Sequence, residues 1–302
     1  MSLVIVGDVH IKSHPLYLNA QIKFLDWLLE NHKNDTIIQT GDFFNNSSIH
    51  HDIMYQIVSI LSNFKDFRII EGNHDKSFRL GSILKNLKHH SNITVYEDIA
   101  EIEIDNHKCL MLPYKYNMSD YEELTGEYDF IFCHFTPREE SFGGEFINID
   151  KLKGKKIYGH IHIQKDYPDA LIIGTPLITR NGEQNNPIIE IDKQGNINKI
   201  EVPKFFDIQT ITYGEKIENF DYLYNITGAP STKSVYDLYP MINIRSAGIQ
   251  VVFSSDEDQE IMLNKLDNDL SKLYSLFCKE RDIDKEYESE GLTAINECVE
   301  GV

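Results

Sequence analysis

Near its N-terminus the chain reads Leu3-Val4-Ile5-Val6-Gly7-Asp8-Val9-His10, four apolar residues followed by a glycine, a carboxylate and an imidazole. A short apolar run that ends at a glycine is typical of a buried strand. From Leu16 the apolar residues recur at helical spacing, which predicts a helix after this strand. Because strand-like and helix-like segments continue to alternate along the chain, we expect an α/β fold built of layers.

The same combination of an apolar run and metal-binding side chains recurs along the chain. The motifs Gly41-Asp42-Phe43-Phe44, Gly72-Asn73-His74-Asp75, Cys133-His134 and Gly159-His160-Ile161-His162 each stand at the end of such a run. In an open α/β sheet the C-terminal ends of parallel strands share one edge, where ligands bind. Motifs that are far apart in the sequence are therefore expected to converge on one place.

The side chains in these motifs favour a pair of metal ions. They are carboxylates, imidazoles and one amide, which suit manganese, iron or zinc, and there is no thiolate set that would impose structural zinc. Asp-x-His and His-x-His also place both of their side chains on one side of an extended segment. So many donors exceed the needs of one ion but suffice for two ions that share a carboxylate. That arrangement serves in-line attack on phosphate esters.

Length, composition and charge restrict the classes of function. The chain has 302 residues, enough for a hydrophobic core that needs no disulfide or structural metal to fold. Its four cysteines are scattered along the sequence, as in reduced cytoplasmic proteins. A net charge of −19 weakens any prediction of broad electrostatic DNA binding, which usually needs a basic surface. Two interpretations remain: an enzyme whose bound cations offset the charge, or a protein whose partner supplies the basic surface.

The sequence also predicts a cytoplasmic location. No apolar run approaches the ~18 residues that a membrane-spanning helix needs. The N-terminal residues have neither a basic segment nor a small-residue cleavage site, so we expect no signal peptide.

The five motifs, in this order, resemble those of the calcineurin-like metallophosphoesterase superfamily. The resemblance covers roughly residues 1–200 and implies a two-sheet β-sandwich flanked by helices, with two divalent metal ions, usually manganese. In the family's pattern Asp8, His10 and His162 would hold the first metal, Asp42 would bridge, and Asn73, His134 and His160 would hold the second. The resemblance further implies that His74 is the catalytic histidine outside the ligand set, oriented by Asp75.

Within the superfamily the chain is most similar to the SbcD-type DNA-repair nucleases of bacteria and phages. Gly41-Asp42-Phe43-Phe44-Asn45 lacks the Asp-Arg-Gly that follows in protein phosphatases. Residues 24–30 of the first helix, Leu112-Pro113-Tyr114, and residues 173–176 with Gly182-Glu183 also match that branch. The sequence departs from this branch at Asn45, where many relatives have His or Asp. We expect this difference to affect how the exonuclease activity is tuned, and not whether metals bind.

We predict two regions, a catalytic domain over residues 1–204 and a small α/β capping or partner-binding region over residues 205–302. In the second region two strand-like segments, residues 241–245 and 249–253, precede a helix with an apolar stripe over residues 263–277. This ββα profile resembles the small capping domain of SbcD-type nucleases.

Three basic side chains are candidates for contact with substrate phosphates. Arg138 closely follows His134, and Lys153 and Lys155 belong to a basic cluster. The alternative for the lysines is a solvated loop.

The sequence therefore predicts a manganese-dependent DNA exonuclease or endonuclease, a subunit of an SbcCD-like recombination and repair complex. Its partners would be DNA and an SbcC-type coiled-coil ATPase, and we also consider a homodimer. Richness in Asn, Ile and Lys suggests a phage source, which would place the protein in the host cytoplasm. Two alternatives stay open: a stand-alone phosphatase or cyclic-nucleotide phosphodiesterase, and a non-enzymatic scaffold on the same fold.

Overall fold

The computed structural model of the chain divides into two compact units, residues 1–208 with 221–223 and residues 209–220 with 224–302. The structure describes residues 2–117, 119–141, 146–179, 183–205, 208–217, 223–229, 238 and 249–252. The domain limits predicted at residue 204, and the capping or partner-binding role predicted for the residues beyond it, stay predictions.

The first sheet of the larger unit has six strands in the order β14-β13-β1-β2-β3-β6. Its parallel strands are β1 (Leu3–Val6), β2 (Thr36–Gln39), β3 (Asp66–Ile70) and β6 (Ile93–Tyr96). β13 (Ile188–Ile191) pairs antiparallel with β1, and β14 (Ile197–Ile200) pairs antiparallel with β13. The C-terminal ends of β1, β2 and β3 therefore lie side by side at one edge.

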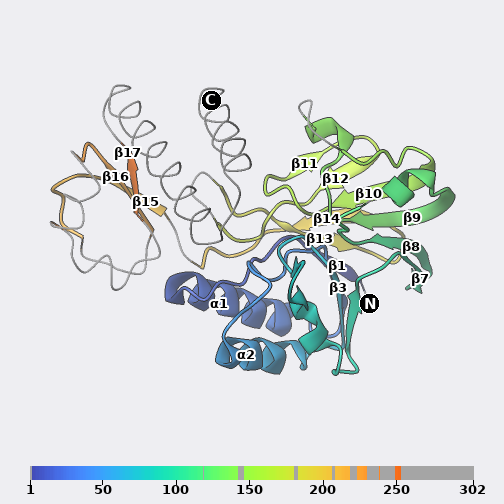
Figure 1. Cartoon of the computed structure of the whole chain (residues 1–302), viewed down its shortest axis with the longest axis horizontal. Coiled ribbons are helices and arrows are strands. Elements are labelled where there is room, and N and C mark those ends of the chain that lie inside the picture. The colour runs from blue at the N-terminus through green and yellow to red at the C-terminus, as the bar shows by residue number, and fades with distance from the viewer. Residues whose placement is uncertain are drawn as a thin grey trace, which may run out of the picture. The chain divides into compact units, whose positions relative to one another are not determined.

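Two helices pack against this sheet (Figure 1). α1 (Pro15–His32) follows β1, as the helical spacing from Leu16 predicted, and α2 (His51–Leu61) follows β2. α1 starts at a proline, whose missing N–H has no cost in the first helical turn. Phe24 of α1 and Ile57 of α2 are fully buried and belong to the same apolar cluster as the sheet residue Val4.

The second sheet also has six strands, in the order β11-β12-β10-β9-β8-β7. They are β7 (Ala100–Ile104), β8 (His107–Leu112), β9 (Gly126–Cys133), β10 (Leu152–Tyr158), β11 (Lys165–Asp166) and β12 (Ala170–Ile172). β8, β9, β10 and β12 are parallel, with an antiparallel strand at each edge. β7 and β8 form a hairpin, and its turn residues Asp105 and Asn106 have φ of 49° and 69°, typical of a two-residue type I′ turn.

The alternation of side chains along β1 shows how the layers pack. Leu3 and Ile5 lie in the core between the two sheets, together with Phe132 and Ile157 of the second sheet. Val4 and Val6 lie in the cluster that includes the helices. Both faces of β1 are thus covered, which explains its continuous apolar run. The predicted fold class, a two-sheet β-sandwich flanked by helices, is confirmed.

A separate three-stranded sheet is formed by β15 (Ile208–Thr212), β16 (Leu223–Thr227) and β17 (Ile249–Val252), with β16 and β17 parallel. β17 coincides with a predicted strand, whereas the sequence pattern did not indicate β15 and β16. The strand predicted over residues 241–245 and the helix over residues 263–277 lie outside the described residues. No helix in the described part of the chain is long and apolar enough to cross a membrane.

Candidate metal centre

The five motifs lie where strands of the two sheets end. Asp8 and His10 follow β1, Asp42 follows β2, and Asn73 follows β3 of the first sheet. His134 follows β9, and His160 and His162 follow β10 of the second sheet. Within each sheet these strands are parallel neighbours, so their C-terminal ends share an edge. The backbone N–H of His160 donates to both carboxylate oxygens of Asp8 at 3.1 Å, which joins the two edges.

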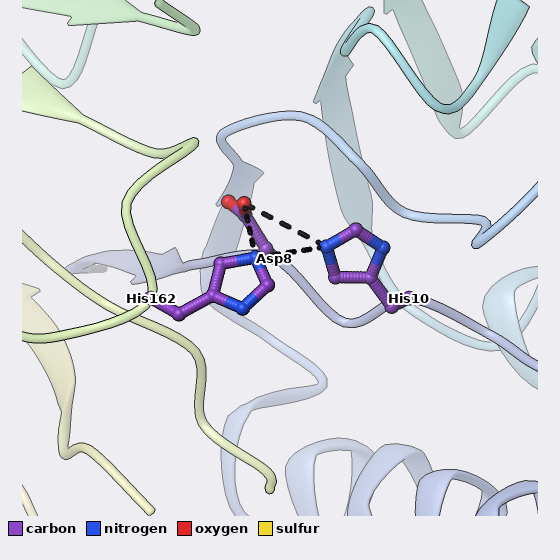
Figure 2. Close-up of side chains that lie close together, drawn as sticks. All are labelled: Asp8, His10 and His162. Carbon is purple, nitrogen blue, oxygen red and sulfur yellow. Dashed lines mark hydrogen bonds and ion pairs between the residues drawn. The ribbon is translucent and has the colours of Figure 1, made fainter. Parts of the chain in front are cut away.

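Asp8, His10 and His162 form the first group of candidate ligands. Figure 2 shows the two imidazoles and the carboxylate pointing toward one another. The Nε2 atoms of His10 and His162 are 3.1 Å apart, and Asp8 Oδ2 lies 4.0 and 3.6 Å from them. Three donors from two sheets thus surround a space of the size of one ion.

Asn73, His134 and His160 form the second group. Asn73 Oδ1 lies 3.2 Å from His134 Nε2 and 3.0 Å from His160 Nδ1. The His134 and His160 rings are 5.2 Å apart between centroids. An amide oxygen with two imidazoles, again from both sheets, offers a second set of donors.

Asp42 stands between the two groups. Its Oδ2 lies 3.8 Å from His10 Nε2, and its Oδ1 lies 3.3 Å from His134 Nε2. One carboxylate oxygen therefore faces each group, which is the position that a bridging ligand needs.

The backbone is strained at three of these residues. His10, Asp42 and His160 have φ of 49°, 51° and 70°, in the left-handed region that non-glycine residues seldom adopt. Each such residue costs roughly 1–3 kcal/mol, and strain of this kind gathers at functional sites whose surroundings hold it in place.

Two motif glycines are required because other atoms of the site pass directly over them. A Cβ on Gly41 would lie 2.1 Å from His134 Nδ1, and a Cβ on Gly72 would lie 2.1 Å from the backbone nitrogen of Asp42. No side chain fits at such distances. These glycines therefore let the ligand-bearing loops approach one another closely.

The donor chemistry and burial fit divalent cations. Asp8, His10, Asp42 and His134 are at most 2% exposed. Burial lowers the pKa of His10 to about 3 and that of His160 to about 4, so both rings are neutral at pH 7, as ligands must be. Burial raises the pKa of Asp8 to about 7, since a buried carboxylate is unstable without a counter-charge. A bound cation would accept the lone pairs of the imidazoles that face one another, and it would also offset the negative charge of the buried carboxylates.

Hydrogen bonds to the far side of two imidazoles fix their orientation. His134 Nδ1 lies 2.7 Å from the carbonyl oxygen of Thr40, and donation of its N–H there leaves Nε2 free to bind. His162 Nδ1 lies 2.5 Å from Glu183 Oε1, while Glu183 Oε2 accepts from the N–H and hydroxyl of Thr179 at 2.7 and 2.9 Å. Burial by itself raises the pKa of Glu183, but the hydrogen bond and charge of His162, together with the two hydrogen bonds from Thr179, outweigh burial and the pKa falls to about 2. Glu183 is thus an ionised partner that orients a candidate ligand.

Glu183 entered the sequence analysis only as part of a branch motif, and its role was missed. It lies 21 residues from His162, so no local pattern links the two. The Gly182-Glu183 pair was the available signal.

The predicted orienting contact from Asp75 to His74 is wrong. The carboxylate of Asp75 is fully buried and accepts from the backbone N–H groups of Phe44 at 2.8 Å and Gly72 at 2.9 Å. His74 Nδ1 lies instead 2.9 Å from the carbonyl oxygen of Asn45. Asp75 therefore ties two motif loops together, and the backbone of Asn45, the residue that departs from the branch pattern, orients His74.

The basic candidates lie in ion pairs or against carbonyl oxygens. Lys153 Nζ pairs with Glu127 at 2.8 Å, and Lys155 Nζ donates to the carbonyl oxygen of Tyr167 at 2.9 Å. Both lysines stand in the first half of β10, roughly 15–25 Å along the strand direction from His160. The predicted contact of these lysines with substrate phosphates stays a prediction. Arg138, which pairs with Asp150 at 3.2 Å, keeps its predicted role as a prediction.

A family model for calcineurin-like phosphoesterases matches residues 1–164. The chain belongs to this family. The matched residues include all seven candidate ligands, and membership makes the chain a metal-dependent phosphoester hydrolase. The predicted superfamily is thereby confirmed.

Several solved structures are similar to the chain. A novel archaeal phosphodiesterase is 18% identical over 66% of this chain and 99% of its own, with a TM-score of 0.38. A protein of unknown function from Aquifex aeolicus is 20% identical over 49% of this chain and 89% of its own, with a TM-score of 0.29. A 5'-nucleotidase precursor from Thermus thermophilus is 12% identical over 68% of this chain and 49% of its own, with a TM-score of 0.34. Among curated proteins no match was found.

Replacing Asp42 tests its position between the groups. Removing a residue that only orients a metal ligand lowers metal affinity roughly 10- to 100-fold. We expect Asp42→Asn to lower it by more, because Asp42 faces both groups of candidate ligands and the substitution removes its charge. Metal content per chain after dialysis measures this, with Asp129→Asn, an exposed carboxylate on β9, as the matched control. Unchanged metal content in Asp42→Asn would contradict the assignment.

Removing the charge of Glu183 tests the orientation of His162. We expect Glu183→Gln to lower metal affinity roughly 10- to 100-fold while the thermal unfolding midpoint of the metal-free protein changes little. Glu101→Gln, at an exposed position on β7, should leave the affinity unchanged. Titration with manganese decides the matter, and equal affinities for wild type and Glu183→Gln would show that Glu183 has no such role.

Proposed function

We propose that the chain is a manganese-dependent DNA nuclease with a two-metal mechanism, the nuclease subunit of an SbcCD-like recombination and repair complex. The geometry around Asp42 supports the two-metal mechanism in this proposal. An ion held by Asp8, His10 and His162 and another held by Asn73, His134 and His160 would share Asp42. Two such ions would polarise the phosphoryl oxygens and stabilise the attacking and leaving oxygens of an in-line displacement.

His74 is the residue that we assign to proton transfer or transition-state stabilisation. Its ring packs edge-on against that of His10, with centroids 4.9 Å apart, so it stands beside the candidate ligands. With Nδ1 directed at the carbonyl oxygen of Asn45, Nε2 is the atom available to the substrate. When the ring is protonated, Nε2 donates a hydrogen bond to the leaving or non-bridging oxygen of the phosphodiester.

The choice of DNA as substrate rests on the resemblance to SbcD-type nucleases. The sequence lacks the Asp-Arg-Gly of protein phosphatases after Gly41-Asp42, and Phe43 and Phe44 stand there instead. Both phenylalanines are fully buried, and their rings pack edge-on at 5.1 Å. They support the loop that carries Asp42, so the branch-specific pattern belongs to the scaffold of the site.

The proposed partners come from the resemblance to SbcD-type nucleases, and the charge supports a need for them. With a net charge of −19, the chain needs bound cations or a basic partner to hold long DNA. An SbcC-type coiled-coil ATPase would supply that surface, a homodimer would add a second copy of the site, and a phage source would place the complex in the host cytoplasm. The same charge favours the second candidate function, a stand-alone hydrolase of small phosphodiesters.

A substrate panel separates these functions. With manganese we expect the full chain to degrade linear DNA and to hydrolyse bis(p-nitrophenyl) phosphate faster than p-nitrophenyl phosphate, and to do neither in EDTA. An Asp42→Asn preparation, purified in parallel, controls for contaminating nucleases. Hydrolysis of the small diester without any cleavage of DNA would favour the stand-alone enzyme over the nuclease.

Substitution of His74 tests its assignment. We expect His74→Asn to lower turnover roughly 10²–10⁴-fold, the usual effect of a positioned acid or base, with metal content unchanged because no ligand is lost. His160→Asn, the matched histidine substitution in the second group, should lose metal as well as rate. Metal stoichiometry and turnover are measured on both variants side by side. Loss of an ion from His74→Asn, or near-full activity with both ions present, would each refute the assignment.

A further inference from the structure

A tight hairpin begins two residues after His74 and holds apolar side chains in solvent. Its strands are β4 (Lys76–Ser77) and β5 (Gly81–Ser82). At its tip Phe78 is 91% exposed and Leu80 is 70% exposed. Exposed apolar side chains held together at one place are typical of a binding surface.

The loop that presents these side chains is well defined. The N–H of Leu80 donates to Ser77 Oγ at 2.9 Å, and Gly81, the first residue of β5, has a φ of 73°, which glycine adopts without strain. The N–H of Ile83 donates to the carbonyl oxygen of Asp75 at 2.9 Å and fixes the base of the hairpin. Phe78 is thus displayed from a hydrogen-bonded turn.

This hairpin is anchored at the edge of the sheets where the metal ligands lie. Lys76 Nζ pairs with Glu71 at 2.8 Å and donates to the carbonyl oxygen of Tyr114 at 3.3 Å. Glu71 directly precedes Gly72-Asn73. Tyr114 lies just beyond β8, whose last residue, Leu112, accepts from the backbone N–H of His134 at 3.1 Å. Both anchor points therefore adjoin ligand-bearing loops.

A second exposed aromatic ring stands against Phe78. Tyr116 is 60% exposed, and its ring lies 6.3 Å from that of Phe78 at an interplanar angle of 69°. Lys76 Nζ lies 5.3 Å from the Tyr116 ring, and the Tyr114 ring packs against it at 6.0 Å. We call the two rings of Phe78 and Tyr116, together with the adjoining apolar side chain of Leu80, the aromatic platform.

The charges around the platform favour an anion. The nearby carboxylates are paired: Glu71 with Lys76 at 2.8 Å, Glu97 with Lys88, and Asp98 with Lys115 at 2.6 Å. Within the described part of the chain, neither Arg79 at the hairpin tip nor Lys85 has a carboxylate partner. Lys85 Nζ lies beside the hairpin, 3.2 Å from where a Cβ on Gly81 would stand. In a chain of net charge −19, the hairpin that carries Phe78 thus has these two cations on it or beside it.

We propose that the aromatic platform binds an unpaired DNA strand, with a base stacked on Phe78 and the adjoining phosphates near Arg79 and Lys85. Exposed rings next to cations are the surface that single strands use, because an unpaired base offers a π-face that a base inside a duplex does not. The inference rests on the proposed nuclease function and names its substrate: single-stranded or frayed ends. A purely apolar protein partner would have no use for the two cations.

Inhibition of small-diester hydrolysis tests the platform in the full, manganese-loaded chain. The readout is the concentration of a 12-nucleotide oligo(dT) that halves the rate on bis(p-nitrophenyl) phosphate, relative to the uninhibited rate of the same variant. We expect Phe78→Ala to raise this concentration roughly 5- to 150-fold, the effect of losing one stacked base. Phe78→Trp should restore inhibition, since it restores a ring.

Matched controls assign the effect to base stacking. Tyr55→Ala removes an aromatic side chain that is 76% exposed on α2 and should leave inhibition unchanged. An abasic 12-mer, which keeps the phosphates, should inhibit wild type and Phe78→Ala equally. If Phe78→Ala unfolds at a lower temperature than wild type, Tyr116→Ala replaces it as the test variant.

Three results would overturn the proposal: no inhibition of wild type by oligo(dT), unchanged inhibition of Phe78→Ala, or an equal effect of the substitution on the abasic strand. Unchanged inhibition would leave the platform as a protein-binding surface. A gel of the same reactions reports cleavage separately. Inhibition that depends on Phe78 without cleavage of the strand would support the platform and refute the nuclease.

Discussion

The placement of one carboxylate between two sheets organises the site. Asp42 follows β2, which lies between β1 and β3, so its side chain reaches ligands on both sides. Its Oδ1 accepts the backbone N–H of His74 at 2.8 Å and faces His134, while Oδ2 faces His10. A buried carboxylate without compensating charge is strongly unfavourable. The cations that the family uses, and the histidines that hold them, are the compensation that this position requires.

The strained loops are held by a second set of buried polar side chains. Gln21 of α1 donates to the carbonyl oxygens of Val9 and His10 at 3.0 and 2.6 Å, and Gln39 donates to that of Gly41 at 2.6 Å. Asp75 accepts N–H groups from two motif loops. These bonds satisfy backbone groups that no strand pairs, and they offset the left-handed geometry that the donors need. The site is therefore preorganised by the chain itself.

Much of the fold and of the ligand set could be predicted because the signals are local. The strand Leu3–Val6 has the bounds that its apolar run predicted, since both faces of the strand are buried. The hairpin β4–β5 was not predicted, because two-residue strands have no periodicity to detect. The link from His162 to Glu183 was missed for a different reason: it joins residues that only folding brings together.

Residue types and their order along the chain were sufficient to predict a layered α/β fold, a cluster of donors at strand ends and a phosphoesterase chemistry. They were sufficient because burial and strand direction act over a few residues at a time. Tertiary structure alone decided what each polar side chain touches. It put the carbonyl oxygen of Asn45, and not the carboxylate of Asp75, against His74, and it left Phe78 exposed at the tip of the β4–β5 hairpin. A hydrogen bond or an exposed ring depends on the relative positions of distant loops, and no local pattern of residues contains those positions.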